Sequence, residues 1–153
     1  NRRFGSVQEL QQVRGFEQLA AFQAIEPYVS ALPSFAPINL NTASVPVLTA
    51  LHENIERTQV EQWATTRDQN QQPIDQVGEF WTQASLDAVT AEQRSALQRF
   101  LSVKSRYYQA QVTVQLSGRS RYLTSDLYRK GAVVQAYQRS LAIIAPMPVA
   151  EPE

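Results

Sequence analysis

Acid–base chemistry in this chain would centre on His52, because it is the single histidine. Glu53 follows it directly, and Glu56 stands three residues further on, a spacing that would place both carboxylates on one helical face. No serine or aspartate takes a spacing that points to a Ser-His-Asp arrangement. A histidine near the end of a helix more often bonds free carbonyls or faces water. A hydrolase is therefore the third hypothesis for function, without a catalytic residue to name.

Phosphate binding needs only backbone amides in a glycine-containing hairpin, as in helix-hairpin-helix units. Arg14 and Gly15 could supply one such hairpin. The hairpin after the next helix would fall at residues 51–55, which lack glycine and carry Glu53 where a phosphate would approach. Fourteen basic residues balance fourteen acidic ones, so no net charge favours nucleic acid. A helix-hairpin-helix DNA-binding module is the alternative hypothesis, and we expect no nucleic-acid partner.

Two adjacent tyrosines, Tyr107 and Tyr108, open a segment in which apolar and polar residues alternate. Exposed tyrosines at a strand start can stack on bases, but cross-strand packing is their commoner use. The alternation places Tyr108 on the same face as four apolar residues of the strand, namely Ala110, Val112, Val114 and Leu116. The segment therefore predicts a strand that is buried on one face.

Turn residues after this strand predict two returning strands. Residues 117–119 form a short turn before a strand at 122–128, with Leu123 and Leu127 facing inward. A second turn at 129–131 precedes a third strand at 132–139. The prediction is a three-stranded antiparallel meander.

The first hundred residues instead predict short helices. Capping boxes of the Ser/Thr-x-x-Glu/Gln type begin at Ser6, Thr58 and Thr90, and Asp75 could cap a further helix. Trp63, Phe80 and Trp81 are the predicted core aromatics of these helices. Residues 3–10 and 73–80 share a pattern of apolar, capping, Val and Glu positions, which suggests two related units of the helix-hairpin-helix or sterile-alpha-motif type.

Composition limits the remaining possibilities. A chain of 153 residues with 43% hydrophobic content can bury one moderate core or two small abutting cores. The sequence has no cysteine, which excludes disulfides, thiolate nucleophiles and Cys-ligated zinc. Its longest apolar run, near residues 141–148, is too short to span a bilayer.

A polar segment, Asn39-Leu40-Asn41-Thr42-Ala43, follows a proline-containing stretch and precedes an apolar helical run that contains Pro46. Asn41, Thr42 or Ser44 could accept hydrogen bonds from the first turn of that helix. On this interpretation, alanine at position 41 or 42 would cost about 1 kcal/mol or less.

The same segment resembles the C-terminal half of minor pseudopilin K of the type II secretion system. The stretches at residues 1–15 and 27–33 look like the entry to and exit from that family's second helical unit. Arg106, Tyr107 and Tyr108 resemble the start of its sheet, and residues 125–129 resemble its returning strand. The resemblance covers roughly residues 1–139, and its motif residues, expected to be structural, are Asn39, Asn41, Thr42, Ala43, Arg106, Tyr107 and Tyr108.

The resemblance implies a structural protein that is not an enzyme. Family members join pseudopilins I and J at the tip of a periplasmic filament, and exported proteins are further candidate partners. A long N-terminal apolar helix anchors them in the inner membrane and packs under their sheet. It is missing here, so the chain would be a C-terminal part, the periplasmic portion of an anchored protein. The family's acidic calcium-binding segment is expected upstream, so we expect no cofactor on this part.

The predicted fold class is therefore α+β, with a helical helix-hairpin-helix or SAM-like region followed by a pilin-like sheet. We expect a helical domain at 1–103, a β meander at 104–140 and a mobile proline-rich tail at 141–153. Without the anchor helix, the apolar face of the sheet needs another cover, for which residues 97–103 are the candidate. On a buried face, Val112→Asp would prevent folding or solubility, whereas Gln111→Asp would cost little.

Overall fold

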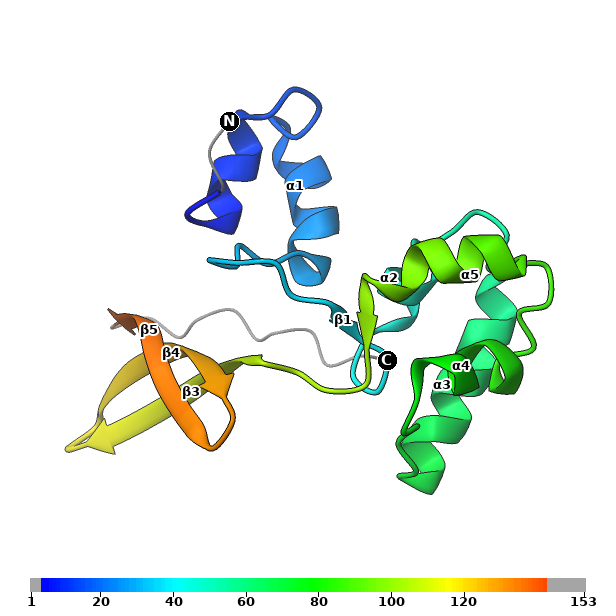
Figure 1. Ribbon diagram of the computed structural model, residues 1–153. Coiled ribbons are helices and arrows are strands. Elements are labelled where there is room, and N and C mark those ends of the chain that lie inside the picture. The colour runs from blue at the N-terminus through cyan, green and yellow to red at the C-terminus, as the bar shows by residue number, and fades with distance from the viewer. Residues whose placement is uncertain (1–3, 143–153) are drawn as a thin grey trace. The chain divides into compact units, whose positions relative to one another are not determined.

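A computed structural model describes residues 4–142 of the chain. The chain divides after Lys104 into a helical unit and a sheet unit, each described by itself below (Figure 1). Helices and a three-stranded antiparallel sheet together confirm the predicted α+β class.

Short helices and one two-stranded ribbon build the helical unit. Two helical turns and one helix come first: η1 (Val7–Gln12), α1 (Leu19–Ile25) and η2 (Glu26–Tyr28). The ribbon strand β1 (Ile38–Asn39) precedes α2 (Val45–Thr49), α3 (Arg57–Asn70), α4 (Val77–Gln83) and α5 (Ala91–Gln98), and β2 (Leu101–Ser102) closes the unit. None of the helices among residues 4–142 has the length and apolar character needed to cross a membrane.

The ribbon joins the two ends of the α2–α5 region. β1 and β2 run parallel, with Ile38 opposite Leu101 and Asn39 opposite Ser102. Parallel strands need a crossover between them, and here residues 40–100 supply it with four helices. The sequence analysis predicted neither strand, because a two-residue strand leaves no periodicity to detect.

Aromatic residues form the centre of the helical core. Trp63, Phe80 and Trp81 are all buried, which confirms their predicted role. The rings of Trp63 and Phe80 meet edge to face with centroids 4.9 Å apart. The other buried members of the cluster are Leu40, Val45, Leu48, Ile55, Val60, Ala64, Ile74, Ala84, Leu86, Val89 and Leu101.

Only one of the predicted helix caps holds as stated. Thr90 accepts a hydrogen bond from the Gln93 backbone N–H, and Gln93 Oε1 accepts one from the Thr90 N–H. Helix α3 begins one residue before Thr58, and neither it nor η1 has a side-chain cap, so the boxes at Thr58 and Ser6 were wrong. The N-cap residue of helix α4 is Gln76 rather than Asp75. Glu79 Oε1 accepts a hydrogen bond from the Gln76 N–H, as in a capping box.

The sheet unit is the predicted antiparallel meander, with order β3 (Tyr107–Leu116), β4 (Arg119–Lys130) and β5 (Val133–Ala142). Ser117 and Gly118 both have positive φ, as a two-residue turn between twisted strands requires. Strand β5 extends past the predicted end at Arg139 to Ala142, so the proposed tail cannot begin at 141. The rest of that predicted tail, residues 143–153, lies outside the described residues.

Asn41 does not cap a helix, contrary to the prediction. Helix α2 begins at Val45 after Ser44, and no side chain caps it. The Asn41 Nδ2 group donates to the backbone oxygens of Ile74, at 3.0 Å, and of Val103, at 3.1 Å. Asn41 Oδ1 accepts from the Ile74 N–H at 2.9 Å. Asn41 thus joins three segments that are distant in sequence.

The energetic expectation for this motif changes accordingly. Asn41→Ala removes three hydrogen bonds and leaves partly buried backbone groups without partners, so we expect a loss of about 2–3 kcal/mol in unfolding free energy. The exposed Thr42 makes no such side-chain bonds, and Thr42→Ala should cost less than about 0.5 kcal/mol. Urea denaturation followed by far-UV circular dichroism measures both. Equal losses for the two variants would contradict the cross-linking role.

Candidate functional site on the sheet

The predicted site residues are divided between the two units. Asn39, Asn41, Thr42 and Ala43 lie in the helical unit, between β1 and α2. Arg106, Tyr107 and Tyr108 lie at the start of β3 in the sheet unit. The Thr42 and Ala43 N–H groups both donate to the Asn39 backbone oxygen, which makes the first group a tight turn.

A buried arginine that the sequence analysis missed supports this turn. The Arg67 guanidinium donates to the backbone oxygens of Leu40, at 2.9 Å, and Ala43, at 3.2 Å. Its side chain is only 7% exposed and pairs with the Asp68 carboxylate. Arginine is suited to this position because its several donors can satisfy carbonyls and a carboxylate together. In the sequence, Arg67 lies in a polar helix and nothing distinguishes it from a surface residue.

Gly15 and His52, considered for phosphate binding and acid–base chemistry, both make local structural hydrogen bonds. The Gly15 N–H, which would face a phosphate, donates instead to the Glu17 carboxylate at 2.7 Å. His52 Nδ1 accepts a hydrogen bond from the Asn54 N–H at 3.1 Å, so it shapes the turn between α2 and α3 rather than bonding a helix carbonyl. Within residues 4–142, no three His, Cys, Asp or Glu side chains come together as metal ligands.

One face of the sheet is apolar and open. The cross-strand register aligns Val112, Leu123 and Leu141 in one row and Tyr108, Leu127 and Ala136 in another. Val112 is 47% exposed and Leu141 is 71% exposed. We call this the apolar face, and its other members from β3 and β5 are Ala110, Val114, Leu116 and Val134.

The segment expected to cover this face has apolar side chains that pack in the helical core. Residues 97–103 belong to the helical unit, where Leu101 is buried and Leu97 and Val103 pack against the helical core. Apolar surfaces of this extent on a folded unit normally mark a contact with another element or another chain. The face is therefore the first candidate assembly surface.

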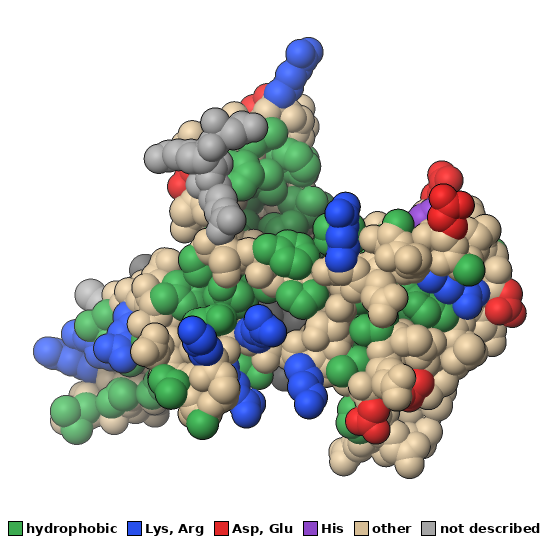
Figure 2. All heavy atoms as spheres, viewed as in Figure 1, with side chains coloured by type: hydrophobic (Ala, Val, Ile, Leu, Met, Phe, Trp, Pro, Cys, Tyr) green, Lys and Arg blue, Asp and Glu red, His purple; other side chains and the backbone are tan. Residues whose placement is uncertain are grey.

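Arginines accompany the apolar residues on the same face. The register puts Arg121 beside Val114, Arg119 beside Leu116 and Arg139 beside Ser125, and Arg129 lies opposite Val134. The single carboxylate within residues 105–142, Asp126, falls on the opposite face. Figure 2 shows basic and hydrophobic side chains gathered together over the sheet. The apolar face is thus suited to an apolar partner element that carries carboxylates at its edges.

Tyrosines gather on the opposite face of the sheet. The rings of Tyr107 and Tyr128 lie 5.0 Å apart across the β3–β4 pair, so cross-strand packing is the role of Tyr107. A bulge opposite Asp126 and Leu127 inserts Tyr137 into β5, and its ring meets Tyr107 edge to face at 5.8 Å. Tyr108, on the apolar face, donates its hydroxyl to the Ser105 backbone oxygen at 2.7 Å.

Burial raises the pKa of Tyr137 above the ordinary 10.0, and the nearby Asp126 carboxylate and Tyr107 raise it further. Each of these disfavours the negative phenolate. Beside it, Asp126 accepts a hydrogen bond from Gln109 Nε2 at 3.0 Å. The Tyr137 phenol therefore keeps its proton to a higher pH than an ordinary tyrosine.

Comparison with known proteins agrees with these observations. Residues 38–104 match the family described as Type II secretion system (T2SS), protein K. Over 130 residues, the chain is 38% identical to the Type II secretion system protein K of Pseudomonas aeruginosa strain PAO1. That alignment covers 84% of this chain and 36% of the relative, so the chain spans about a third of the length of the relative it matches.

A structural match extends over nearly the whole chain. The chain resembles one in the crystal structure of the GspK-GspI-GspJ complex from the enterotoxigenic Escherichia coli Type 2 Secretion System, with a TM-score of 0.74. Identity is 23%, and the match covers 93% of this chain and 49% of that chain. This chain therefore shares the α+β fold of that chain. More specifically, the chain belongs to the type II secretion system protein K family.

The tyrosine cluster makes a prediction about alkaline stability. Because the pKa of Tyr137 is higher in the folded chain, the folded state keeps its proton above pH 10 while the unfolded state loses it. The stabilisation that Tyr137 contributes is fully present below pH 10, and it is lost as the pH rises further. Tyr137→Phe should reduce the alkaline loss, as measured by denaturant unfolding at pH 9 and pH 11. The exposed Tyr28→Phe is the control, and an equal effect of both changes would contradict the assignment.

Proposed function

We propose that this chain is the C-terminal part of a minor pseudopilin, which acts in assembly rather than catalysis. The main observation in support is the 38% identity to a type II secretion system protein K over 84% of the chain. By analogy with the GspK-GspI-GspJ complex, its partners are the pseudopilins I and J of its own system. The assembly forms the tip of the pseudopilus and supports protein export.

The proposed location is the periplasm, as the outer portion of a protein anchored in the inner membrane. Support comes from family membership. The helical unit suits a tip position in this proposal, because a large unit added to a pilin-like sheet would obstruct subunits stacked above it.

The apolar face of the sheet is the surface proposed to carry the assembly. Each row of this face, such as Val112, Leu123 and Leu141, would bury apolar area against an apolar helix, at about 25 cal/mol per Å². Arg121 and Arg139 would then pair with carboxylates on that helix or on a neighbouring subunit. Desolvated charges without such partners would oppose docking, so the arginines limit which helices fit.

Co-elution with soluble domains of pseudopilins I and J tests the partners directly. The full 153-residue chain is mixed with both domains and run on size-exclusion chromatography, and we expect one ternary peak. A titration with duplex DNA runs in parallel, because the arginines of the sheet form a local basic patch. We expect binding no tighter than about 10⁻⁴ M at physiological salt. Micromolar, steeply salt-dependent DNA binding without co-elution would favour the helix-hairpin-helix alternative.

Substitution on the apolar face tests which surface is used. Val112 is half exposed in this chain, so Val112→Asp should leave folding intact, which corrects the expectation that it would prevent folding. In an assembly, the added carboxylate would be buried and cost several kcal/mol, so co-elution should be lost. Gln111→Asp lies on the other face of the same strand and should co-elute normally. Equal behaviour of the two variants would exclude the apolar face as the contact.

A further inference from the structure

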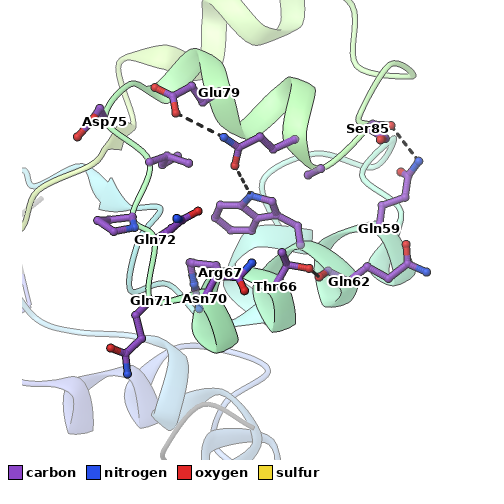
Figure 3. Close-up of a pocket in the computed structure, with 15 residues that line it drawn as sticks. Gln59, Gln62, Thr66, Arg67, Asn70, Gln71, Gln72, Asp75, Glu79 and Ser85 are labelled. Carbon is purple, nitrogen blue, oxygen red and sulfur yellow. Dashed lines mark hydrogen bonds between the residues drawn. The ribbon is translucent and has the colours of Figure 1, made fainter.

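A polar groove in the helical unit has no part in the proposed assembly surface. It has a volume of about 880 Å³, within the range of ligand sites, and lies between α3, the loop at 71–75 and the end of α4 (Figure 3). Side-chain amides dominate its lining, with five glutamines and one asparagine among fifteen residues. Amides both donate and accept hydrogen bonds, so the lining suits a ligand that presents both kinds of group.

The floor of the groove is fixed. Trp63 is one of the residues that line it, with the Arg67 guanidinium 5.2 Å from the ring centroid and the Trp63 indole N–H bonded to Gln83 Oε1 at 3.4 Å. Gln83 in turn donates to Glu79, and Gln59 Nε2 reaches Ser85 O at 2.9 Å. These contacts hold the two helical walls at a set separation.

Two residues with positive φ, Gln71 and Ser85, line the groove. Gln71 ends α3 with φ 49°, a position where glycine is usual, and Ser85 follows α4 with φ 53°. They are two of the three non-glycine residues with positive φ within residues 4–142. Such strain persists where the surrounding structure enforces it and is concentrated at functional sites.

Several ligand classes do not fit. A phosphate or carboxylate would meet Asp75 and Glu79, while the Arg67 guanidinium is buried and already satisfied by Leu40, Ala43 and Asp68. A sugar needs an open aromatic face, but Trp63 is only 5% exposed. An apolar ligand would strip water from the amides without replacing their hydrogen bonds.

An extended peptide satisfies these constraints, because its backbone alternates donors and acceptors along its length. The α3 wall from Gln59 to Asn70 is about 16 Å long, the length of about five extended residues. Gln72 turns its amide toward the groove centre, and neither it nor Asn70 has a side-chain hydrogen bond to any other described residue (Figure 3). Asp75 adds a preference for a positive charge. We propose that this groove binds an extended, basic segment of a partner polypeptide.

Binding is tested on the full ¹⁵N-labelled chain by NMR with an acetylated Thr-Lys-Ser-Lys-Thr amide as the probe. We expect saturable shifts at the backbone amides of residues 70–75, with a Kd of about 1 mM or tighter. Gln72→Ala and Asp75→Asn should each weaken binding at least about threefold. Gln69→Ala, on the same helix but outside the groove, is the matched control and should bind as the parent does.

Three comparison ligands separate backbone recognition from charge alone. The peptide with glutamates in place of its lysines should not bind, and a backbone N-methylated version should bind at least about tenfold more weakly because it lacks N–H donors. Spermidine carries comparable charge without peptide groups and should not displace the probe. The proposal is overturned if the N-methylated peptide binds equally, if spermidine displaces the probe, or if Gln69→Ala weakens binding as much as Gln72→Ala. It also fails if the shifts do not saturate.

Discussion

The helical unit depends on satisfying the backbone of residues 38–43 as it passes through the core. Leu40 is completely buried in this segment, so the carbonyls around it lose contact with water. Two side chains satisfy backbone groups at this point, one from α3 and one from the segment itself. Arg67 binds the Leu40 and Ala43 oxygens, while Asn41 reaches out to Ile74 and Val103. A buried polar group without a partner costs more than a hydrogen bond gains, so these two residues are constraints on the fold rather than additions to it.

These bonds also explain how short helices form one unit. Helix α2 has five residues and α4 has seven, lengths at which an isolated helix is unstable in water. Their stability must come from packing, and Asn41 connects the start of α2 to the loop before α4 and to the residue after β2. The Asn-Thr-Ala motif is thus a structural junction, and this role fits the part of the chain over which the family match extends.

Features with a local cause could be predicted from sequence. The meander followed from period-two alternation and from Gly118 and Gly131, and the cap at Thr90 followed from its box. Features that join distant residues could not. The ribbon of Ile38 and Leu101 depends on chain closure across sixty residues, and neither strand carries a pattern. Asn41 was interpreted as a cap for the same reason, since capping is the local role of an asparagine before a helix and its real partners are far away in sequence.

The net charge of the whole chain also hides a difference in charge between its two parts. The formal net charge is zero, yet residues 105–142 hold six Lys or Arg and one Asp, while residues 1–104 hold eight Lys or Arg and eleven Asp or Glu. The strand register then sorts the sheet charges further, because the arginines at 119, 121, 129 and 139 share the apolar face and Asp126 does not. An acidic partner element would therefore be favoured at the sheet and a basic one at the groove beside Asp75 and Glu79. The two units therefore differ in the charge of the partner that each would favour.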